Sequence, residues 1–225
     1  MIRTLLLVLS AVLMSAVNVF LLQYSDIKNE RKIAVIFKSA FALSKKKAVF
    51  IVLMFALNIS MAVVFTFLYY AQTILFSLKR FALISLLWVA AFYDYKSFRI
   101  PNKLILLGLI YRFIILIAEF FFEFDTLLSS IVSELIAAAA LLLLGIVCNL
   151  LMKNSIGMGD VKLFILMGLF QGVSGVIYSV FISLLVSFFI SVFMLITRKK
   201  TRKDVIPFAP AILCGTYISV VLTGI

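Results

Sequence analysis

The sequence contains no histidine and only two cysteines. Without histidine, the chain cannot be a zinc peptidase with an H-E-x-x-H motif, nor a hydrolase that pairs a serine or cysteine nucleophile with histidine. Cys148 and Cys214 lie in apolar segments and form no C-x-x-C pair, so neither a zinc site nor a redox motif is indicated. No P-loop or other glycine-rich nucleotide motif is present. Carboxylate chemistry remains for hydrolysis, and we predict no metal and no cofactor.

Charged residues are also scarce, at 13% of the 225 residues compared with about 25% in ordinary soluble domains. Hydrophobic residues make up 65%, and apolar segments long enough to cross about 30 Å of hydrocarbon recur along the chain. We therefore predict an all-α, polytopic membrane protein with about eight transmembrane helices, or seven as the fallback. The apolar segments lie near residues 3–22, 48–71, 76–94, 103–122, 126–151, 161–173, 175–197 and 206–224. We expect the first to be retained, not cleaved as a signal peptide, because no clear A-x-A site follows it.

The distribution of basic residues indicates how these segments are oriented. With eight spans, most of the 21 Lys and Arg residues fall on one side, and only Arg3, Lys79, Arg80 and Arg112 fall on the other. The positive-inside rule assigns the richer side to the cytoplasm and both termini to the outside of the inner (plasma) membrane. The net charge of +12 also favours contact with anionic membrane lipid. A nucleic-acid role would need a basic soluble domain, which the sequence lacks.

The apolar segments divide the chain into two predicted regions. Residues 1–75 form an N-terminal two-helix membrane region with a short basic cytoplasmic loop at 23–47, and residues 76–225 form a six-helix core. Apolar residues among the lysines of the loop suggest an amphipathic helix that lies at the membrane surface.

Two aspartates stand out because each lies at the predicted cytoplasmic edge of an apolar segment. Asp94 ends the segment 76–94 and is followed by Lys96 and by the triplet Ile100-Pro101-Asn102. Proline disfavours helical geometry at the residue before it, so this triplet predicts a turn that starts the next helix. A carboxylate beside hydrocarbon is costly. Two of them at one face suggest a paired-carboxylate hydrolase, and the alternative is two ordinary interfacial acids, each paired with its own lysine.

The second aspartate, Asp160, opens the segment that follows Gly157-Met158-Gly159, and Lys162 comes two residues later. Glycines without a Cβ atom let the backbone come close to a neighbouring helix or to an extended substrate. Positions i and i+2 of a helix do not face each other, so direct pairing of either aspartate with its lysine is not expected. We predict instead that Lys96 and Lys162 extend to lipid headgroups.

Together these motifs resemble the type IV prepilin peptidases, a family of GxGD intramembrane aspartyl peptidases. The resemblance covers roughly residues 76–225. The segment Ile206-Pro207-Phe208-Ala209-Pro210-Ala211 is similar to the family's Pro-Phe-Gly-Pro-Phe stretch, with alanine in place of the glycine and of the second phenylalanine. Residues of these motifs that support the site or contact substrate are expected to include Gly157, Gly159, Lys96, Lys162, Ile100, Pro101, Asn102, Pro207, Phe208 and Pro210.

The resemblance implies that Asp94 and Asp160 are the catalytic pair of an aspartic-type endopeptidase. It also implies prepilin or pseudopilin precursors as partners, each with a short basic leader that is removed at the cytoplasmic membrane face. Bifunctional members of the family also methylate the new N-terminus and have a cytoplasmic insertion with C-x-x-C zinc motifs. This chain has a short loop without cysteine at that place, so we do not expect methyl transfer.

Such a pair hydrolyses a peptide when the ionised carboxylate activates a water and the protonated one polarises the scissile carbonyl. Asp160 lies at a predicted helix N-terminus, which favours the anion, and Asp94 lies near a helix C-terminus, which disfavours it. We therefore predict that Asp160 is mainly the base and Asp94 the acid. Glu134, the other acid within a span, is expected either to pair across helices or to contact substrate.

Two other functions remain open at this point. A small transporter could use the two aspartates as proton or cation sites, although acids that bind transported ions usually lie near the midplane. A non-catalytic assembly subunit is the other alternative, although both aspartates and both glycines are present. The sequence does not specify the precursor, the pilus, secretion or DNA-uptake system that is served, or whether the protein forms homo-oligomers.

Overall fold

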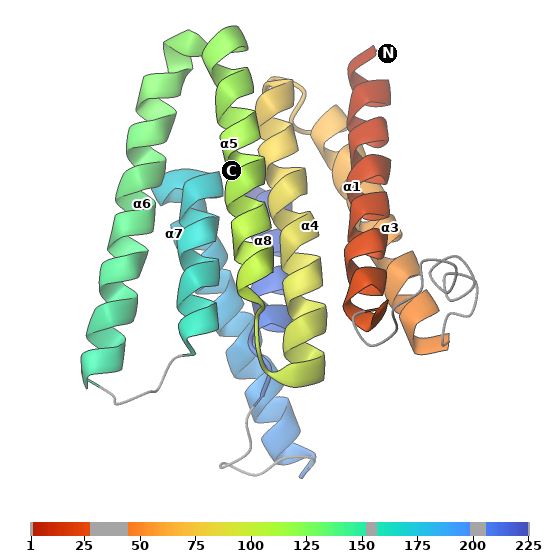
Figure 1. Ribbon diagram of the computed structural model, residues 1–225, viewed down its shortest axis with the longest axis vertical. Coiled ribbons are helices and arrows are strands. Elements are labelled where there is room, and N and C mark those ends of the chain that lie inside the picture. The colour runs from red at the N-terminus through yellow and green to blue at the C-terminus, as the bar shows by residue number, and fades with distance from the viewer. Residues whose placement is uncertain (1, 28–44, 152–156, 199–205, 225) are drawn as a thin grey trace. The chain divides into compact units, whose positions relative to one another are not determined.

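The computed structural model describes residues 2–27, 45–151, 157–198 and 206–224. The described residues form helices and short connections, without a strand (Figure 1). The helices are α1 (Ile2–Ile27), α3 (Lys45–Phe67), α4 (Ile74–Ser97), α5 (Asn102–Phe122), α6 (Phe124–Leu151), α7 (Met158–Ile196) and α8 (Ala209–Thr223). The predicted all-α class is therefore confirmed. The amphipathic helix that the loop 23–47 suggested lies largely outside the described residues.

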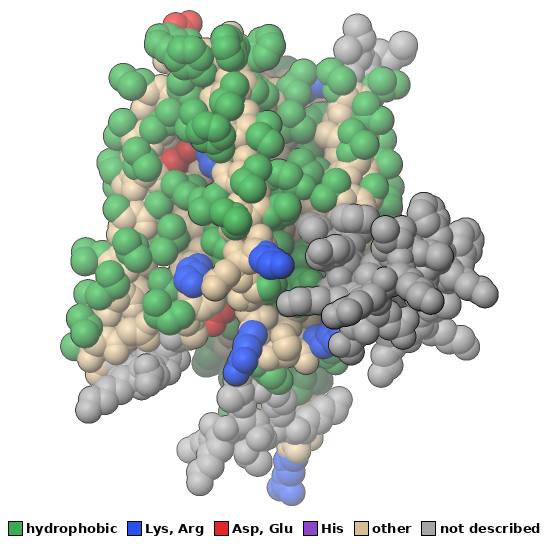
Figure 2. All heavy atoms as spheres, viewed as in Figure 1, with side chains coloured by type: hydrophobic (Ala, Val, Ile, Leu, Met, Phe, Trp, Pro, Cys, Tyr) green, Lys and Arg blue, Asp and Glu red, His purple; other side chains and the backbone are tan. Residues whose placement is uncertain are grey.

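Five helices in the described part of the chain are long and apolar enough to cross a membrane. They include α4, α5, α6 and α7 and the segment Val49–Phe67 of α3, while Arg3–Val19 and α8 are shorter apolar helices. Figure 2 shows apolar side chains over most of the visible surface of α5 and α6. These features fit the predicted polytopic membrane protein, and the count of about eight spans stays a prediction.

The chain divides by its internal packing into two compact units, Met1–Phe81 and Ala82–Ile225, with the boundary inside α4. In the first unit α1 packs on α3, and Asn58 Nδ2 donates a hydrogen bond of 2.8 Å to Ser15 Oγ between them. Both side chains are buried, and the bond gives the Asn58 Nδ2 group a partner inside the interface between the two helices. The predicted division near residue 75 remains a prediction.

In the second unit small residues let the helices approach closely. A Cβ atom added at Gly168 of α7 would lie 2.9 Å from the backbone nitrogen of Ala138 in α6. One added at Gly108 of α5 would meet the side chains of Leu166 in α7 and Leu86 in α4. The glycines therefore place α7 directly against α6 and place α5 between α4 and α7.

Helix α7 is interrupted at Gly172, whose backbone angles (φ 67°, ψ −172°) are not helical. The arm before the break, residues 158–171, is about 20 Å long at 1.5 Å per residue. Figure 1 shows the ribbon changing direction at the end of this arm. The sequence predicted separate segments at 161–173 and 175–197, and Gly172 lies at the end of the first.

Candidate active site

A pocket of about 320 Å³ lies where α4 ends, α5 begins and α7 begins. The two predicted catalytic aspartates both line it, and they are close enough for their charges to interact. The lining residues are Asp94, Phe98, Arg99, Ile100, Gly157, Met158, Gly159 and Asp160. Residues about 60 positions apart in the sequence are thus brought to one cavity.

Asp94 occupies the last turn of α4, and its side chain is buried. The Phe98 backbone N–H donates to the Asp94 carbonyl at 2.9 Å, after which Phe98 adopts a left-handed conformation (φ 51°). That conformation ends the helix, because a residue with a positive φ cannot continue a right-handed α-helix. Pro101 then serves as the N-cap of α5 with extended backbone angles. The turn predicted from Ile100-Pro101-Asn102 is therefore confirmed.

Asp160 lies in the first turn of α7, where Gly157 is the N-cap. A Cβ atom at Gly157 would lie 3.1 Å from Asp160 Oδ2, and one at Gly159 would lie 3.3 Å from the Ile100 side chain. The first glycine therefore leaves room for the carboxylate, and the second lets α7 approach the residue before Pro101. The predicted place of Asp160 at a helix N-terminus is confirmed.

The segment around Phe208 also reaches the site. Ala209 is the first residue of α8, and its backbone N–H donates a hydrogen bond of 2.8 Å to Asp94 Oδ2. Phe208 is the N-cap of α8 and packs edge-on against Phe164 of α7, with ring centroids 5.8 Å apart. Pro210 lies in the first turn of α8, directly after Pro207, Phe208 and Ala209.

The Ala209 contact removes the basis of one prediction. We expected helix position to favour the anion at Asp160 and disfavour it at Asp94. Asp94 does end α4, but the N-terminus of α8 donates to its carboxylate, which favours the anion by a comparable amount, about 0.3–1 kcal/mol. Both aspartates thus lie at a helix N-terminus, and helix position does not distinguish the acid from the base.

Lys162 behaves differently from what we expected. Its ammonium donates a hydrogen bond of 2.9 Å to Asn102 Oδ1 instead of simply extending outward, because α5 and α7 begin side by side at this end. The contact joins the Ile-Pro-Asn motif to the Gly-x-Gly-Asp-x-Lys motif. Lys96, in contrast, lies on an exposed side of α4 and does not line the pocket.

Sequence reasoning missed two kinds of residue. Phe98 and Arg99 line the pocket because they form the short connection after α4, and the proximity of Arg99 to the aspartate motif was the available signal. Ala209 acts through its backbone, which no side-chain pattern reveals. Figure 2 shows Lys and Arg side chains gathered near the ends of α4 and α5 that meet here.

No group of three or more His, Cys, Asp or Glu residues in the described part of the chain is placed to hold a metal ion. The pocket offers two carboxylates, one guanidinium side chain and the backbone of a glycine-rich turn. This arrangement can bind an extended peptide and a water molecule beside paired carboxylates.

Comparison with known protein families gave one match. A model of the type IV leader peptidase family matches residues 81–195, slightly more than half of the chain. The matched region contains both aspartates and the whole lining of the pocket. No curated protein and no solved structure was found to match the chain.

Proposed function

The chain belongs to the type IV leader peptidase family, and from this we propose that it is a membrane-embedded aspartyl endopeptidase. Its substrates are prepilin-like or pseudopilin precursors, from which it removes the short basic leader. The observation that carries the proposal is that Asp94 and Asp160, from α4 and α7, line one pocket together with both glycines of the Gly-x-Gly-Asp motif.

The proposed reaction uses the two carboxylates as a unit. Two neighbouring carboxylates do not both ionise readily, so they share one proton. The ionised carboxylate removes a proton from water as the water oxygen attacks the scissile carbonyl carbon, while the protonated one donates to the carbonyl oxygen. As the tetrahedral intermediate collapses, one of its hydroxyls returns a proton to the carboxylate that is now ionised, the C–N bond breaks, and the other carboxyl gives its proton to the leaving amine. No covalent enzyme intermediate forms.

The Ala209 N–H fixes the orientation of the Asp94 carboxylate. Its hydrogen bond to Oδ2 of Asp94 occupies one carboxylate oxygen and leaves the other for water, substrate or the shared proton. Because the donor is a backbone group at a helix start, it holds Asp94 in one orientation throughout the reaction.

The pocket rim suits an extended peptide followed by an apolar helix. Phe98 and Met158 are large, exposed and apolar, and both line the pocket. A basic leader would approach the two carboxylates, while the apolar segment of the precursor would lie against the helices. Basic side chains near the site, among them Lys96, Arg99 and Lys103, support its place at the cytoplasmic face by the positive-inside rule. The proposal does not extend to methyl transfer.

Leader cleavage by the detergent-purified protein tests the proposal. We expect the wild type to shorten a prepilin-like precursor by its leader, and Asp94→Asn and Asp160→Asn to leave the precursor intact. Asp125→Asn is the matched control, because Asp125 is an exposed acid that does not line the pocket. Full cleavage by either pocket variant would contradict the aspartyl mechanism.

The same preparation separates the two alternatives. A proton- or cation-coupled transporter would dissipate an ion gradient across liposomes and would lose this activity in the aspartate variants. A non-catalytic assembly subunit would neither cleave nor transport. Cleavage without ion flux is the result that the proposal predicts.

A further inference from the structure

The break in α7 separates two backbone groups that an uninterrupted helix would pair. In an α-helix the N–H of Val173 would donate to the carbonyl of Leu169. Because Gly172 is not helical, each group has a side-chain partner instead. The Leu169 carbonyl accepts a hydrogen bond of 3.0 Å from Arg112 Nε, and the Val173 N–H donates one of 3.0 Å to Ser133 Oγ. Arg112 comes from α5 and Ser133 from α6.

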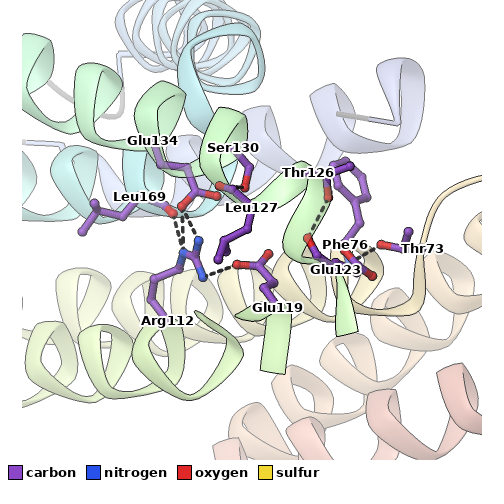
Figure 3. Close-up of polar contacts among 10 residues, drawn as sticks. All are labelled: Thr73, Phe76, Arg112, Glu119, Glu123, Thr126, Leu127, Ser130, Glu134 and Leu169. Carbon is purple, nitrogen blue, oxygen red and sulfur yellow. Dashed lines mark hydrogen bonds and ion pairs between the residues drawn. The ribbon is translucent and has the colours of Figure 1, made fainter. Parts of the chain in front are cut away.

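Two carboxylates hold the Arg112 side chain in place (Figure 3). Its Nη1 donates to Glu119 Oε2 at 2.9 Å, and its Nε and Nη2 both donate to Glu134 Oε2. All three residues are buried. The pairing of Glu134 across helices, one of the two roles expected for it, is therefore what the structure contains.

Burying three charged groups among apolar helices is costly, and replacing such a cluster by apolar residues often leaves a protein as stable as before. Stability alone therefore does not explain the cluster. What apolar residues could not do is donate to the Leu169 carbonyl at the end of the first arm of α7.

The opposite end of the same arm is part of the active site. The arm begins at Met158 and includes Asp160 in its first turn. A short helix is stiff, so a shift or rotation at Leu169 is transmitted to Asp160 about two and a half turns away. Asp94 is held by the Ala209 N–H at the start of α8, whose N-cap Phe208 packs against Phe164 of the same arm. The position of the arm therefore affects whether the two carboxylates meet.

We propose that Arg112 and Ser133 are positioning residues, which fix the end of the first arm of α7 and thereby hold Asp160 opposite Asp94. The effect on catalysis rests on the proposed function, whereas the effect on the position of Asp160 does not. All the residues that carry it lie in the second unit.

The test uses variants that remove the side-chain partners of Leu169 and Val173 without leaving buried charges. The triple variant Arg112→Leu/Glu119→Gln/Glu134→Leu removes the donor to Leu169 together with its two carboxylate partners. Ser133→Ala removes only the acceptor for Val173. Ser130→Ala is the matched control, because Ser130 lies on the same helix and bonds only the Leu127 carbonyl of its own turn.

A geometric readout comes from cysteine cross-linking across the pocket. Phe98→Cys places a thiol directly after α4 and Met158→Cys places one at the first residue of α7; both positions line the pocket, and their native side chains are 50% and 62% exposed. Cys148→Ser and Cys214→Ser remove the native thiols. Bifunctional thiol reagents of graded length then report how far the start of α7 lies from the end of α4, whether or not the protein cleaves anything.

We expect one narrow range of reagent lengths to bridge the pocket in the cysteine background and in Ser130→Ala. The range should shift or broaden in the triple variant and, less strongly, in Ser133→Ala. With the native rim residues, kcat for leader cleavage should fall roughly 10- to 100-fold in the triple variant, while KM stays near the wild-type value.

An unchanged cross-linking pattern in Ser133→Ala and in a folded triple variant would overturn the inference. If the triple variant does not fold, Ser133→Ala decides alone. A shifted pattern in a protein that cleaves no precursor would support the positioning role and would count against the proposed function, so the two failures are distinguishable.

Discussion

The backbone N–H of Ala209 donates a hydrogen bond of 2.8 Å to Oδ2 of Asp94, across 115 positions of the sequence. The contact brings the start of α8 to the end of α4, and so joins the third sequence motif to the first. It also supplies Asp94 with a helix N-terminus in addition to the C-terminal turn in which it lies. The environment of this carboxylate therefore depends on how α8 is held.

Phe208→Ala tests that dependence. The ring of Phe208 packs against Phe164 of α7, and such aromatic pairs contribute about 0.5–1.5 kcal/mol beyond their buried area. We expect the loss of the ring to loosen the start of α8 and to lower kcat for leader cleavage, with Phe208→Leu less affected. Phe188→Ala is the control, because Phe188 is exposed on the second part of α7. Equal activities in all three variants would show that the pair does not support Asp94.

Gly157, the N-cap of α7, and Gly168, inside α7, should respond differently to alanine. At Gly157 the new Cβ atom would lie 3.1 Å from Oδ2 of Asp160, the end of a side chain that can rotate away. At Gly168 it would lie 2.9 Å from the backbone of Ala138, which cannot move without separating α6 from α7. Gly157→Ala should therefore lower kcat with little change in melting temperature.

Gly168→Ala should instead lower stability by about 1–3 kcal/mol, the usual cost of overpacking. Thermal unfolding in detergent and initial cleavage rates, measured on both variants, give the comparison. The reverse assignment, with Gly157→Ala unstable and Gly168→Ala slow but stable, would contradict the packing described here.

The contact between Lys162 and Asn102 predicts coupling between the two motifs. Lys162→Met and Asn102→Leu should each lower the cleavage rate several-fold, because each removes the hydrogen bond that joins the starts of α5 and α7. An exposed polar contact of this kind is worth at most about 1 kcal/mol. The double variant should be no slower than the slower single variant. Lys103→Met, one position along from Asn102, is the control, and fully additive losses would argue against a direct role of the contact.

The conformation of Gly172 predicts a further loss of stability. Its combination of φ 67° and ψ −172° is almost exclusive to glycine, and forcing another residue into such a region costs about 1–3 kcal/mol. The added Cβ atom would also lie 2.7 Å from Ser133 Oγ. We expect Gly172→Ala to lower the melting temperature and Ser133→Ala to relieve only part of that loss. Gly224→Ala, at the end of α8, should lower the melting temperature less than Gly172→Ala does. A larger decrease for Gly224→Ala would contradict this prediction.

Sequence patterns predicted the parts of this structure that local chemistry determines. Apolar length predicted the helices, Pro101 predicted the turn after α4, and Gly157-Met158-Gly159 predicted a helix start at Asp160. The sequence predicted two separate segments at 161–173 and 175–197, and the structure interrupts α7 at Gly172, near the end of the first. Each of these signals is local: apolar length matches the thickness of hydrocarbon, proline restricts the residue before it, and glycine permits backbone conformations and close approaches that other residues do not.

The contacts that assemble the site could not be predicted in the same way. The bond between Ala209 and Asp94 uses a backbone group, and Lys162 meets Asn102 only because two helices begin side by side. Charge counting assigns Arg112 to the outer side and does not indicate that its side chain is buried among helices. Its partners come from three helices, and nothing in the local sequence around it indicates a broken helix elsewhere in the chain.

The central claim is that Asp94 and Asp160 act as one catalytic unit, and single-turnover cleavage by the two single variants and the double variant tests it most directly. We predict that Asp94→Asn and Asp160→Asn each reduce the rate on the order of 10³-fold or more, and that the double variant is at most a few-fold slower than either. Asp125→Asn should cleave at the wild-type rate. Modest single losses that multiply in the double variant would contradict the claim, since they would mean that the two carboxylates act independently.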